Sequence, residues 1–416
     1  MIQVTIVENP TGSMKFLLSF ISENAKELKE SSAALFLSIF ASAVAGAFLS
    51  NSKEMLLIIP GLIILIPGAT NMRGAIFGAV GARLGSAFHL GQIKSFSLRN
   101  DIVKTNVLSS VYLSVIFPVM LASLASLFSR ILGYKGATIS TFITIAFIGS
   151  IVAGSILLVV TFFIAFTAYG RGWDPDNVTA PLIASIGDII TLPSLLFAAW
   201  LTLRFSRFSG YFSLAVIGLL MALVVSILLG GDSKTRTIVI QSAVVLSVTT
   251  LLNTLSGLLL QEKLVALIAI PSILVLLPAF LSQGGNIGSI FASRFSTKLH
   301  LGIIQEKGRR RIETIKEMLG AYTFALLIFP AVGVISIGIS GFMGIPNILG
   351  AKLVLVSLFG GLIVTTIVVL ASFYISIFFM RRSIDPDNVI VPIITSLADI
   401  LGVVSLVIVL TLFGSV

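Results

Sequence analysis

Residues 385–399 read Asp385-Pro-Asp-Asn-Val-Ile-Val-Pro-Ile-Ile-Thr-Ser-Leu-Ala-Asp399, and they repeat an earlier stretch that reads Asp174-Pro-Asp-Asn-Val-Thr-Ala-Pro-Leu-Ile-Ala-Ser-Ile-Gly-Asp188. Each copy opens with an Asp-Pro pair, typical of a helix start, and ends in one carboxylate within an apolar run. At about 1.5 Å per residue, that last aspartate lies roughly 21 Å along the helix. In a bilayer core about 30 Å thick it would be deep in the hydrocarbon zone. A charge there costs at least about 2.5–3.5 kcal/mol, so two matched aspartates predict a water-filled path and one shared cation.

The composition places the chain in the membrane class. Hydrophobic residues make up 56% of the 416 residues, charged residues only 11%, and the mean hydropathy is +1.10. Charged residues are about a quarter of a soluble domain, so that class is excluded. The absence of cysteine excludes disulfides and thiol chemistry. The net charge of +10 needs no nucleic-acid partner, because membrane proteins concentrate Lys and Arg in cytoplasmic loops.

The duplication extends well beyond the two quoted stretches. Adding 211 to a residue number in the first half finds its counterpart in the second: Pro60 maps to Pro271, Arg83 to Arg294, and Asp188 to Asp399. A constant offset over more than a hundred residues indicates an internal repeat. We expect five membrane spans in each half. They are residues 33–50, 55–84, 107–132, 139–169 and 178–200, then residues 238–260, 264–295, 318–339, 353–380 and 389–413.

An unrepeated apolar run, residues 211–229, lies between the halves and is long enough to cross once. Five spans in the first half would place the second copy upside down in the membrane relative to the first. The linking span adds one more crossing and restores the same direction. We therefore predict an all-α polytopic membrane protein of about eleven spans, with two parallel five-helix repeats related by a pseudo-twofold axis along the membrane normal. The expected organisation is an N-terminal cytoplasmic segment, a first repeat, a linker with one transmembrane helix, and a second repeat, at residues 1–32, 33–203, 204–237 and 238–416.

The distribution of Lys and Arg favours a cytoplasmic N-terminus and an extracytoplasmic C-terminus in a multi-pass plasma-membrane protein. Within the N-terminal segment, residues 14–28 are expected to form a short amphipathic helix on the membrane face. Because one chain holds both halves, a monomer could carry the complete site.

The second span of each half is too long for one straight crossing and contains helix-breaking residues. These are Pro67-Gly68 in the first half, and Pro278 followed by Gln283-Gly-Gly-Asn286 in the second. We expect interrupted helices whose freed carbonyls, including that of Gly285, line a cavity. The amides of Asn71 and Asn286 would enter this cavity from slightly different heights.

These groups make an all-oxygen lining that suits hard divalent cations. Two carboxylates with neutral oxygens favour a cation that keeps its water, and Mg²⁺ dehydrates reluctantly. The hydroxyls expected to contribute belong to Ser185, Thr191, Ser396 and Thr395. Four further aspartates, Asp174, Asp176, Asp385 and Asp387, form either a cytoplasmic acidic vestibule or simple helix caps.

The motifs resemble a known family. The Pro-x(4)-Gln-Gly-Gly-Asn-x-Gly pattern at residues 278–288, and the patterns ending in Asp188-Ile189 and Asp399-Ile400, resemble the transmembrane domain of the MgtE magnesium channels. The tandem arrangement is closer to the eukaryotic solute-carrier magnesium transporters. The resemblance implies two MgtE-like repeats around a central pore, with Asp188 and Asp399 holding hydrated Mg²⁺. It also implies that the carbonyls of Ala184 and Thr395 help through water.

The first half departs from the family pattern, because it reads Pro67-Gly-Ala-Thr-Asn-Met-Arg-Gly74, which predicts an asymmetric pore entrance. Arg73, in this stretch, is an alternative salt-bridge partner for the two buried aspartates.

Two other functions compete with a divalent-cation channel. A carrier that exchanges Mg²⁺ for Na⁺ would use the same oxygen ligands. An intramembrane aspartyl protease also needs two buried carboxylates. Such proteases carry a Gly-x-Gly-Asp motif at one aspartate and a Tyr-Asp motif at the other. The residues here are Ser185-Ile-Gly-Asp188 and Ser396-Leu-Ala-Asp399, so neither half has either motif. We therefore expect a transporter and no enzyme.

Overall fold

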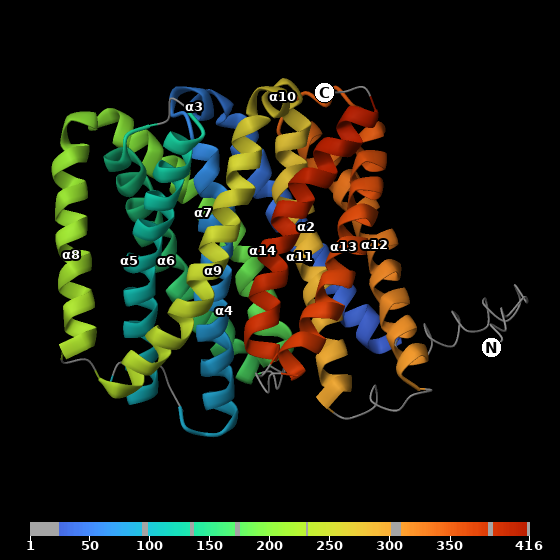
Figure 1. Ribbon diagram of the computed structural model, residues 1–416, viewed down its shortest axis with the longest axis horizontal. Helices are drawn as coiled ribbons and strands as arrows, with labels where there is room; N and C mark the ends of the chain where they lie inside the picture. Colours follow the sequence, from blue (N-terminus) through green and yellow to red (C-terminus); the bar gives the residue numbers. More distant parts are fainter. Residues whose placement is uncertain are drawn as a thin grey trace, which may run out of the picture.

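The structure is a computed structural model that describes residues 25–93, 99–133, 137–170, 175–229, 232–300, 309–381 and 386–413. Every regular element among these residues is a helix (Figure 1). The first repeat contains α2 (Ala25–Asn51), α3 (Lys53–Ile58), η1 (Leu62–Ile64), α4 (Leu65–His89), α5 (Asp101–Ile131), α6 (Ile139–Gly170) and α7 (Pro175–Arg204). The linker contains η2 (Ser206–Phe208) and α8 (Ser209–Leu229). The second repeat contains α9 (Ser233–Glu262), α10 (Leu264–Ala269), α11 (Pro271–His300), α12 (Arg309–Phe342), α13 (Lys352–Arg381) and α14 (Pro386–Leu412).

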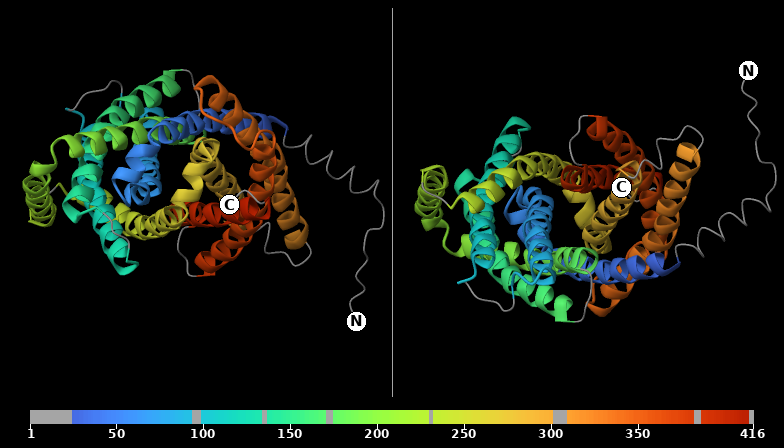
Figure 2. Two further views of the ribbon diagram at one scale, coloured as in Figure 1. Left: turned by 90° about the horizontal axis from the view of Figure 1, so that it is seen from above. Right: turned by 90° about the horizontal axis from the view of Figure 1, so that it is seen from below.

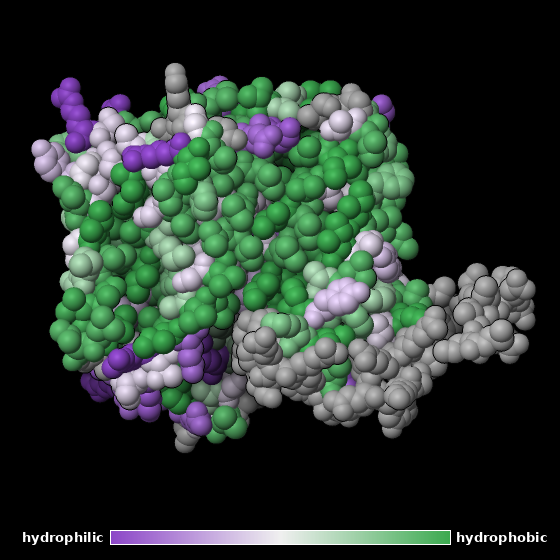
Figure 3. All heavy atoms as spheres, in the orientation of Figure 1, coloured by the Kyte–Doolittle hydropathy of each residue, from purple (hydrophilic) through white to green (hydrophobic). Residues whose placement is uncertain are grey.

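Ten of these helices are long and apolar enough to cross a membrane, and α2 adds a shorter apolar stretch, Leu35–Asn51. The side of the molecule seen in Figure 3 has a broad hydrophobic band with hydrophilic residues at its upper and lower edges. This distribution is that of a polytopic membrane protein, as the composition predicted. The predicted amphipathic helix at residues 14–28 lies largely outside the described residues.

The two halves run in the same direction through the molecule. The offset of 211 residues relates α3 to α10, α5 to α12 and α7 to α14, and the helices of each such pair are drawn running the same way (Figure 1). The unrepeated α8 crosses once between α7 and α9 at the edge of the bundle (Figures 1 and 2). The predicted parallel repeats are confirmed, because the linking helix restores the direction of the second copy.

The interruption of the second spans lies elsewhere than predicted. The chain breaks at residues 59–61, between α3 and η1, where Gly61 adopts φ +91°, a backbone conformation that favours glycine. Its counterpart in the second repeat is the break between α10 and α11, where Pro271 is the first helical residue. Pro67 lies in the first turn of α4, where its missing N–H costs little. Pro278 and the Gln283–Asn286 stretch lie inside the continuous helix α11, so the prediction of freed carbonyls there was wrong.

The repeats exchange their first helices. Helix α2 packs on α11 and α12 of the second repeat, and α9 packs on α4 and α5 of the first. Glycine permits both crossings: a Cβ added at Gly46 would lie 2.3 Å from the carbonyl oxygen of Val275, and one at Gly257 would lie 2.3 Å from that of Ile64. Gly46 and Gly257 are counterparts under the 211-residue offset, as are Ile64 and Val275. The two halves therefore interlock through two equivalent close backbone contacts.

Seen from above and below, α2 with α7 and α9 with α14 form opposite sides of the bundle, and α4 and α11 stand between them (Figure 2). This arrangement brings the middles of these six helices together. It is here that the buried polar residues of the two repeats meet.

Candidate functional site

Asp188 lies near the middle of α7 and is half-buried. Its carboxylate accepts a 2.6 Å hydrogen bond from the hydroxyl of Ser42, a fully buried residue of α2. The bond is charge-assisted, so it offsets part of the cost of removing the carboxylate from water.

Asp399, the counterpart on α14, is more deeply buried, at 6% exposed. Its carboxylate accepts a hydrogen bond from the side-chain amide of Asn71 on α4. The same amide nitrogen donates a 3.1 Å bond to the side-chain oxygen of Asn253 on α9. Asn71 thus reaches from the first repeat to two helices of the second.

The surroundings of the two aspartates correspond between the repeats. Ser42 and Asn253 are counterparts under the 211-residue offset, so the same helix of each repeat supplies a polar group beside the aspartate. The arrangement is nevertheless asymmetric, because Ser42 bonds Asp188 directly whereas Asn253 is joined to Asp399 through Asn71. The predicted asymmetry between the halves thus extends to the polar contacts of their aspartates.

Helix α11 also sends an amide to the opposite repeat. Gln283 donates a 3.1 Å hydrogen bond to the hydroxyl of Ser38 on α2, one turn before Ser42. Asn286, predicted to act like Asn71, is half-buried and makes no hydrogen bond within the described part of the chain. Asn71 and Gln283 therefore each donate from one repeat to a helix of the other, including its first helix.

The glycines of the second spans set the spacing between helices. A Cβ added at Gly285 would lie 3.3 Å from Cα of Thr395 on α14, and one at its counterpart Gly74 would lie 3.7 Å from Cβ of Ala184 on α7. The Gly285 carbonyl lies inside α11 and accepts a 2.8 Å hydrogen bond from the Ser289 hydroxyl. Its role in the structure is close helix packing.

The remaining predicted ligands differ in their surroundings. Ala184 and Thr395 are half-buried one turn before the aspartates, and the Thr395 hydroxyl donates to the Pro392 carbonyl at 2.9 Å. Ser185 and Ser396 are buried, and the Ser396 hydroxyl has no partner within the described residues. Four predicted vestibule residues fall outside the described side chains: Asp174, Asp176, Asp385 and Asp387.

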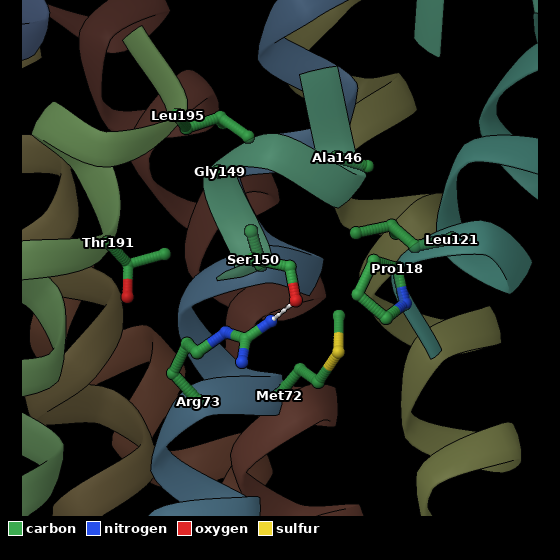
Figure 4. A pocket seen from close by; sticks show the side chains of 10 residues that line it. Met72, Arg73, Pro118, Leu121, Ala146, Gly149, Ser150, Thr191 and Leu195 are labelled. Atoms are coloured by element: carbon green, nitrogen blue, oxygen red, sulfur yellow. Dashed lines mark hydrogen bonds between the residues drawn. The ribbon is translucent and has the colours of Figure 1, made fainter. Parts of the chain in front are cut away.

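Arg73 does not pair with either aspartate. Its guanidinium is 1% exposed and points between α5 and α6, where it donates to the hydroxyls of Ser114, at 3.0 Å, and Ser150 (Figure 4). It also lies over the Phe77 ring, 5.9 Å from the centroid. The second repeat has Gly284, Ala325 and Gly361 at the three equivalent positions, so this cluster is unique to the first repeat.

Thr191 lines the same small cavity as Arg73, of about 10 Å³ (Figure 4). Its hydroxyl and the Arg73 Nε have no partner in the described structure. Thr191 therefore faces α4 and α6 through this cavity, and the prediction that its hydroxyl helps to line the aspartate site is not supported by this position.

Sequence reasoning missed Ser42 and Asn253 as members of the site. A signal for them was present, because both are polar, both lie in the middle of an apolar span, and they are 211 residues apart. Their contact with the aspartates depends on how α2 and α9 pack, which the local sequence does not specify.

This arrangement can hold a cation through oxygen atoms. Two carboxylates, an amide and hydroxyls lie near the centre of the bundle. Among the described residues, no three His, Asp or Glu side chains lie close enough together to bind one metal ion. So few charged ligands suit a hard divalent cation that retains part of its water.

The fold is that of an internally duplicated, multi-pass membrane protein, with one matched aspartate inside each repeat. A comparison with protein families matches residues 66–198 and again residues 277–409 to MgtE, the divalent cation transporter family. These segments are offset by the same 211 residues and together cover more than half of the chain. The chain belongs to the MgtE family, and the predicted resemblance is confirmed. Membership of a transporter family also bears out the expectation that the chain is not an enzyme.

Several curated proteins resemble the chain along most of its length. Solute carrier family 41 member 2 of Xenopus laevis is 26% identical, over 92% of this chain and 73% of that protein. The human protein of the same name is 26% identical over 82% of this chain, and the match spans 62% of its length. Solute carrier family 41 member 3 of Rattus norvegicus is 24% identical over 82% of this chain and 77% of its own. No solved structure matches the chain.

Proposed function

We propose that this protein moves Mg²⁺ across the plasma membrane along a path between its two repeats, residues 33–203 and 238–416, and that Asp188 and Asp399 provide the two charges of one ion site. The observation that carries the proposal is the meeting of these matched carboxylates with Asn71, Ser42 and Asn253 in the interior of a divalent cation transporter. Two negative charges match one divalent cation, which removes the cost of burying them.

The hydrogen bonds around the aspartates offset part of the cost of burying them. Ser42 and Asn71 each donate to one carboxylate, so neither charge is left without a partner. A cation that approaches Asp399 competes with the Asn71 amide group for the same oxygen. If Asn71 turns as the ion binds, its side-chain oxygen becomes available to the ion or to its water.

The contribution of one carboxylate can be bounded by Coulomb's law. A divalent cation separated from a carboxylate by a water layer, at about 4 Å, gains about 2 kcal/mol in bulk water and about 8 kcal/mol at an effective dielectric constant of 20. Even the lower value corresponds to roughly a thirtyfold change in affinity. Replacing either aspartate with the isosteric asparagine should therefore abolish most transport at low Mg²⁺.

The test is Mg²⁺ uptake into liposomes that contain the full chain, its Asp188→Asn variant or its Asp399→Asn variant. Asp101→Asn, an exposed residue in the first turn of α5, is the matched control for the loss of one carboxylate and should transport normally. Uptake at the wild-type rate in both site variants would remove the assignment. The same liposomes with and without a Na⁺ gradient distinguish a channel, whose flux persists without the gradient, from a Na⁺-coupled carrier.

The proposed orientation places the N-terminus in the cytoplasm and the C-terminus outside, supported by the bias of Lys and Arg between the loops. The Asp-Pro starts of α7 and α14 then lie at the cytoplasmic end of the path, where Asp174, Asp176, Asp385 and Asp387 would form its acidic entrance. One chain contains both halves of the site, so a monomer is sufficient for transport.

A further inference from the structure

A second cavity lies away from the aspartates, near the end of α4 and the beginnings of α5 and α9. Its volume is about 660 Å³. Two basic side chains line it, Arg83 from α4 and Lys234 from α9, together with apolar residues such as Ala87 and Ile238. No acidic side chain occurs among the described residues that line it. The cavity therefore combines an apolar wall with two cations.

Arg83 is held so that part of its guanidinium remains available. Its Nε donates a 2.7 Å hydrogen bond to the side-chain oxygen of Asn106, whose own amide donates to the Ile102 carbonyl at 2.9 Å. The terminal amino groups of Arg83 have no partner within the described part of the chain. Arg83 is half-buried, so a full positive charge without a carboxylate partner lies partly out of water.

The second repeat fills the equivalent place with an ion pair. The counterparts of Ala87 and Asn106 are Lys298 and Glu317, which form a 2.8 Å salt bridge in which Glu317 is nearly buried. In the first repeat the short Ala87 leaves open space, and the neutral Asn106 accepts from Arg83 without supplying a carboxylate. The first repeat thus has room for an anion beside Arg83, where the described lining of the cavity supplies no carboxylate.

The cavity lies at the boundary of the apolar region. Ser233 and Lys234 open α9, and Val244, two turns beyond Thr237 on the same face of that helix, is 66% exposed. Hydrophilic residues gather below the hydrophobic band in this part of the molecule (Figure 3). An anion bound here would sit at headgroup height, with exposed apolar helix surface deeper in the bilayer.

One carboxylate lies near the rim. Asp232 caps α9, and its carboxylate accepts from the backbone N–H and hydroxyl of Thr235 and from the hydroxyl of Thr105, which lines the cavity. The backbone bond from Thr235, the largest cause, holds the pKa of Asp232 below its usual value, so it stays charged. Asp232 balances at most one of the two cations and leaves a net positive cavity.

We infer that this cavity binds the phosphate headgroup of an anionic membrane lipid, with Arg83 and Lys234 as its charged partners. A lipid phosphate provides the acceptor oxygens that the Arg83 guanidinium lacks, and its acyl chains can lie along the apolar surface of α9. A free phosphate ion offers the same charge without the apolar contact. The inference does not depend on the transported ion.

The experiment measures lipid retention by native mass spectrometry on the full chain, purified with phosphatidylglycerol or with phosphatidylcholine of identical acyl chains. The unmodified chain is expected to retain phosphatidylglycerol preferentially. Each basic residue near an anionic headgroup contributes about fivefold to binding, so Arg83→Gln and Lys234→Gln should each reduce retention by about that factor. Lys352→Gln, an exposed lysine that opens α13 at the opposite face, should have no effect.

A double variant tests the argument without removing either cation. Ala87→Lys combined with Asn106→Glu copies the pair that the second repeat already accommodates, so the variant should fold, fill the open space beside Arg83 with an ion pair and lose the lipid. Excess glycerol phosphate added to the unmodified chain should leave the bound lipid in place. Equal retention of both lipids, full retention by the Arg83, Lys234 and double variants, or displacement of the lipid by glycerol phosphate would each overturn the inference.

Discussion

The crossing of α9 over the first repeat yields a sharp prediction for Gly257→Ala. The new Cβ would lie 2.3 Å from the carbonyl oxygen and 2.7 Å from Cα of Ile64, whereas ordinary contacts begin near 3.4 Å. Both neighbours are backbone atoms, so no side chain can turn away, and the helices must separate by about 1 Å. Overpacking of this kind costs about 1–3 kcal/mol, and the better helix propensity of alanine returns about 1 kcal/mol. We expect a net loss of up to about 2 kcal/mol, and a loss of about 1–3 kcal/mol relative to an alanine that makes no such contact.

The displacement also reaches the acidic site. Asn253 lies one turn before Gly257 on α9, and its bond to Asn71 is 3.1 Å long. A shift of about 1 Å takes that distance beyond the range of a hydrogen bond. Gly257→Ala should therefore lower both the thermal unfolding midpoint in detergent and the Mg²⁺ flux in liposomes. Gly46→Ala, its counterpart, should do the same because its contact with Val275 is equally short.

The matched control is Gly218→Ala on α8. A Cβ added there meets nothing within 4 Å, so only helix propensity acts, and the variant should be unchanged or more stable by up to about 1 kcal/mol. If Gly257→Ala melts and transports like the unmodified chain while Gly218→Ala behaves as expected, the close crossing of α9 and η1 is refuted.

Three further outcomes are expected. Asn71→Ala removes the amide that donates to Asp399, so it should destabilise the Mg²⁺-free protein by about 1–3 kcal/mol. Added Mg²⁺ should then raise the thermal unfolding midpoint more in this variant than in the unmodified chain. An equal rise in both proteins would contradict the proposed competition between Asn71 and the ion. Arg73→Ala should lower the free energy of unfolding by about 2–4 kcal/mol because it leaves a cavity, whereas Arg73→Met keeps most of the side-chain volume and should lower it much less. Equal losses of unfolding free energy in the two variants would mean that the positive charge is the essential feature. The pKa of Asp232 is lowered in the folded state, so its contribution to stability is present above its ordinary pKa and is lost as the pH falls through the lowered value. Asp232→Asn keeps a capping side chain, so the unfolding midpoints of the variant and of the unmodified chain should converge in acid. A constant difference between the two midpoints from pH 7 to pH 3 would argue against this cap.

Much of this protein could be predicted from local sequence. Composition and span length identify a membrane protein, because only long apolar helices satisfy their backbone polar groups in lipid. The 211-residue offset identifies the duplication, and the unrepeated run at residues 211–229 fixes the parallel direction of the copies. Asp188 and Asp399 stand out for the same reason, since a carboxylate within an apolar run carries a cost that needs an explanation.

Only the tertiary structure decided which groups these aspartates meet. Ser42 is 146 residues from Asp188, and Asn71 is 328 residues from Asp399, so their contacts depend on the packing of α2 on α7 and of α4 on α14. The position of the helix break was also decided by packing, because Pro67 fits a first helical turn and Pro278 is tolerated within α11. Apolar periodicity says which segments are buried, but in a membrane almost any pair of apolar helices can pack, and close backbone contacts such as those at Gly46 and Gly257 select the partners.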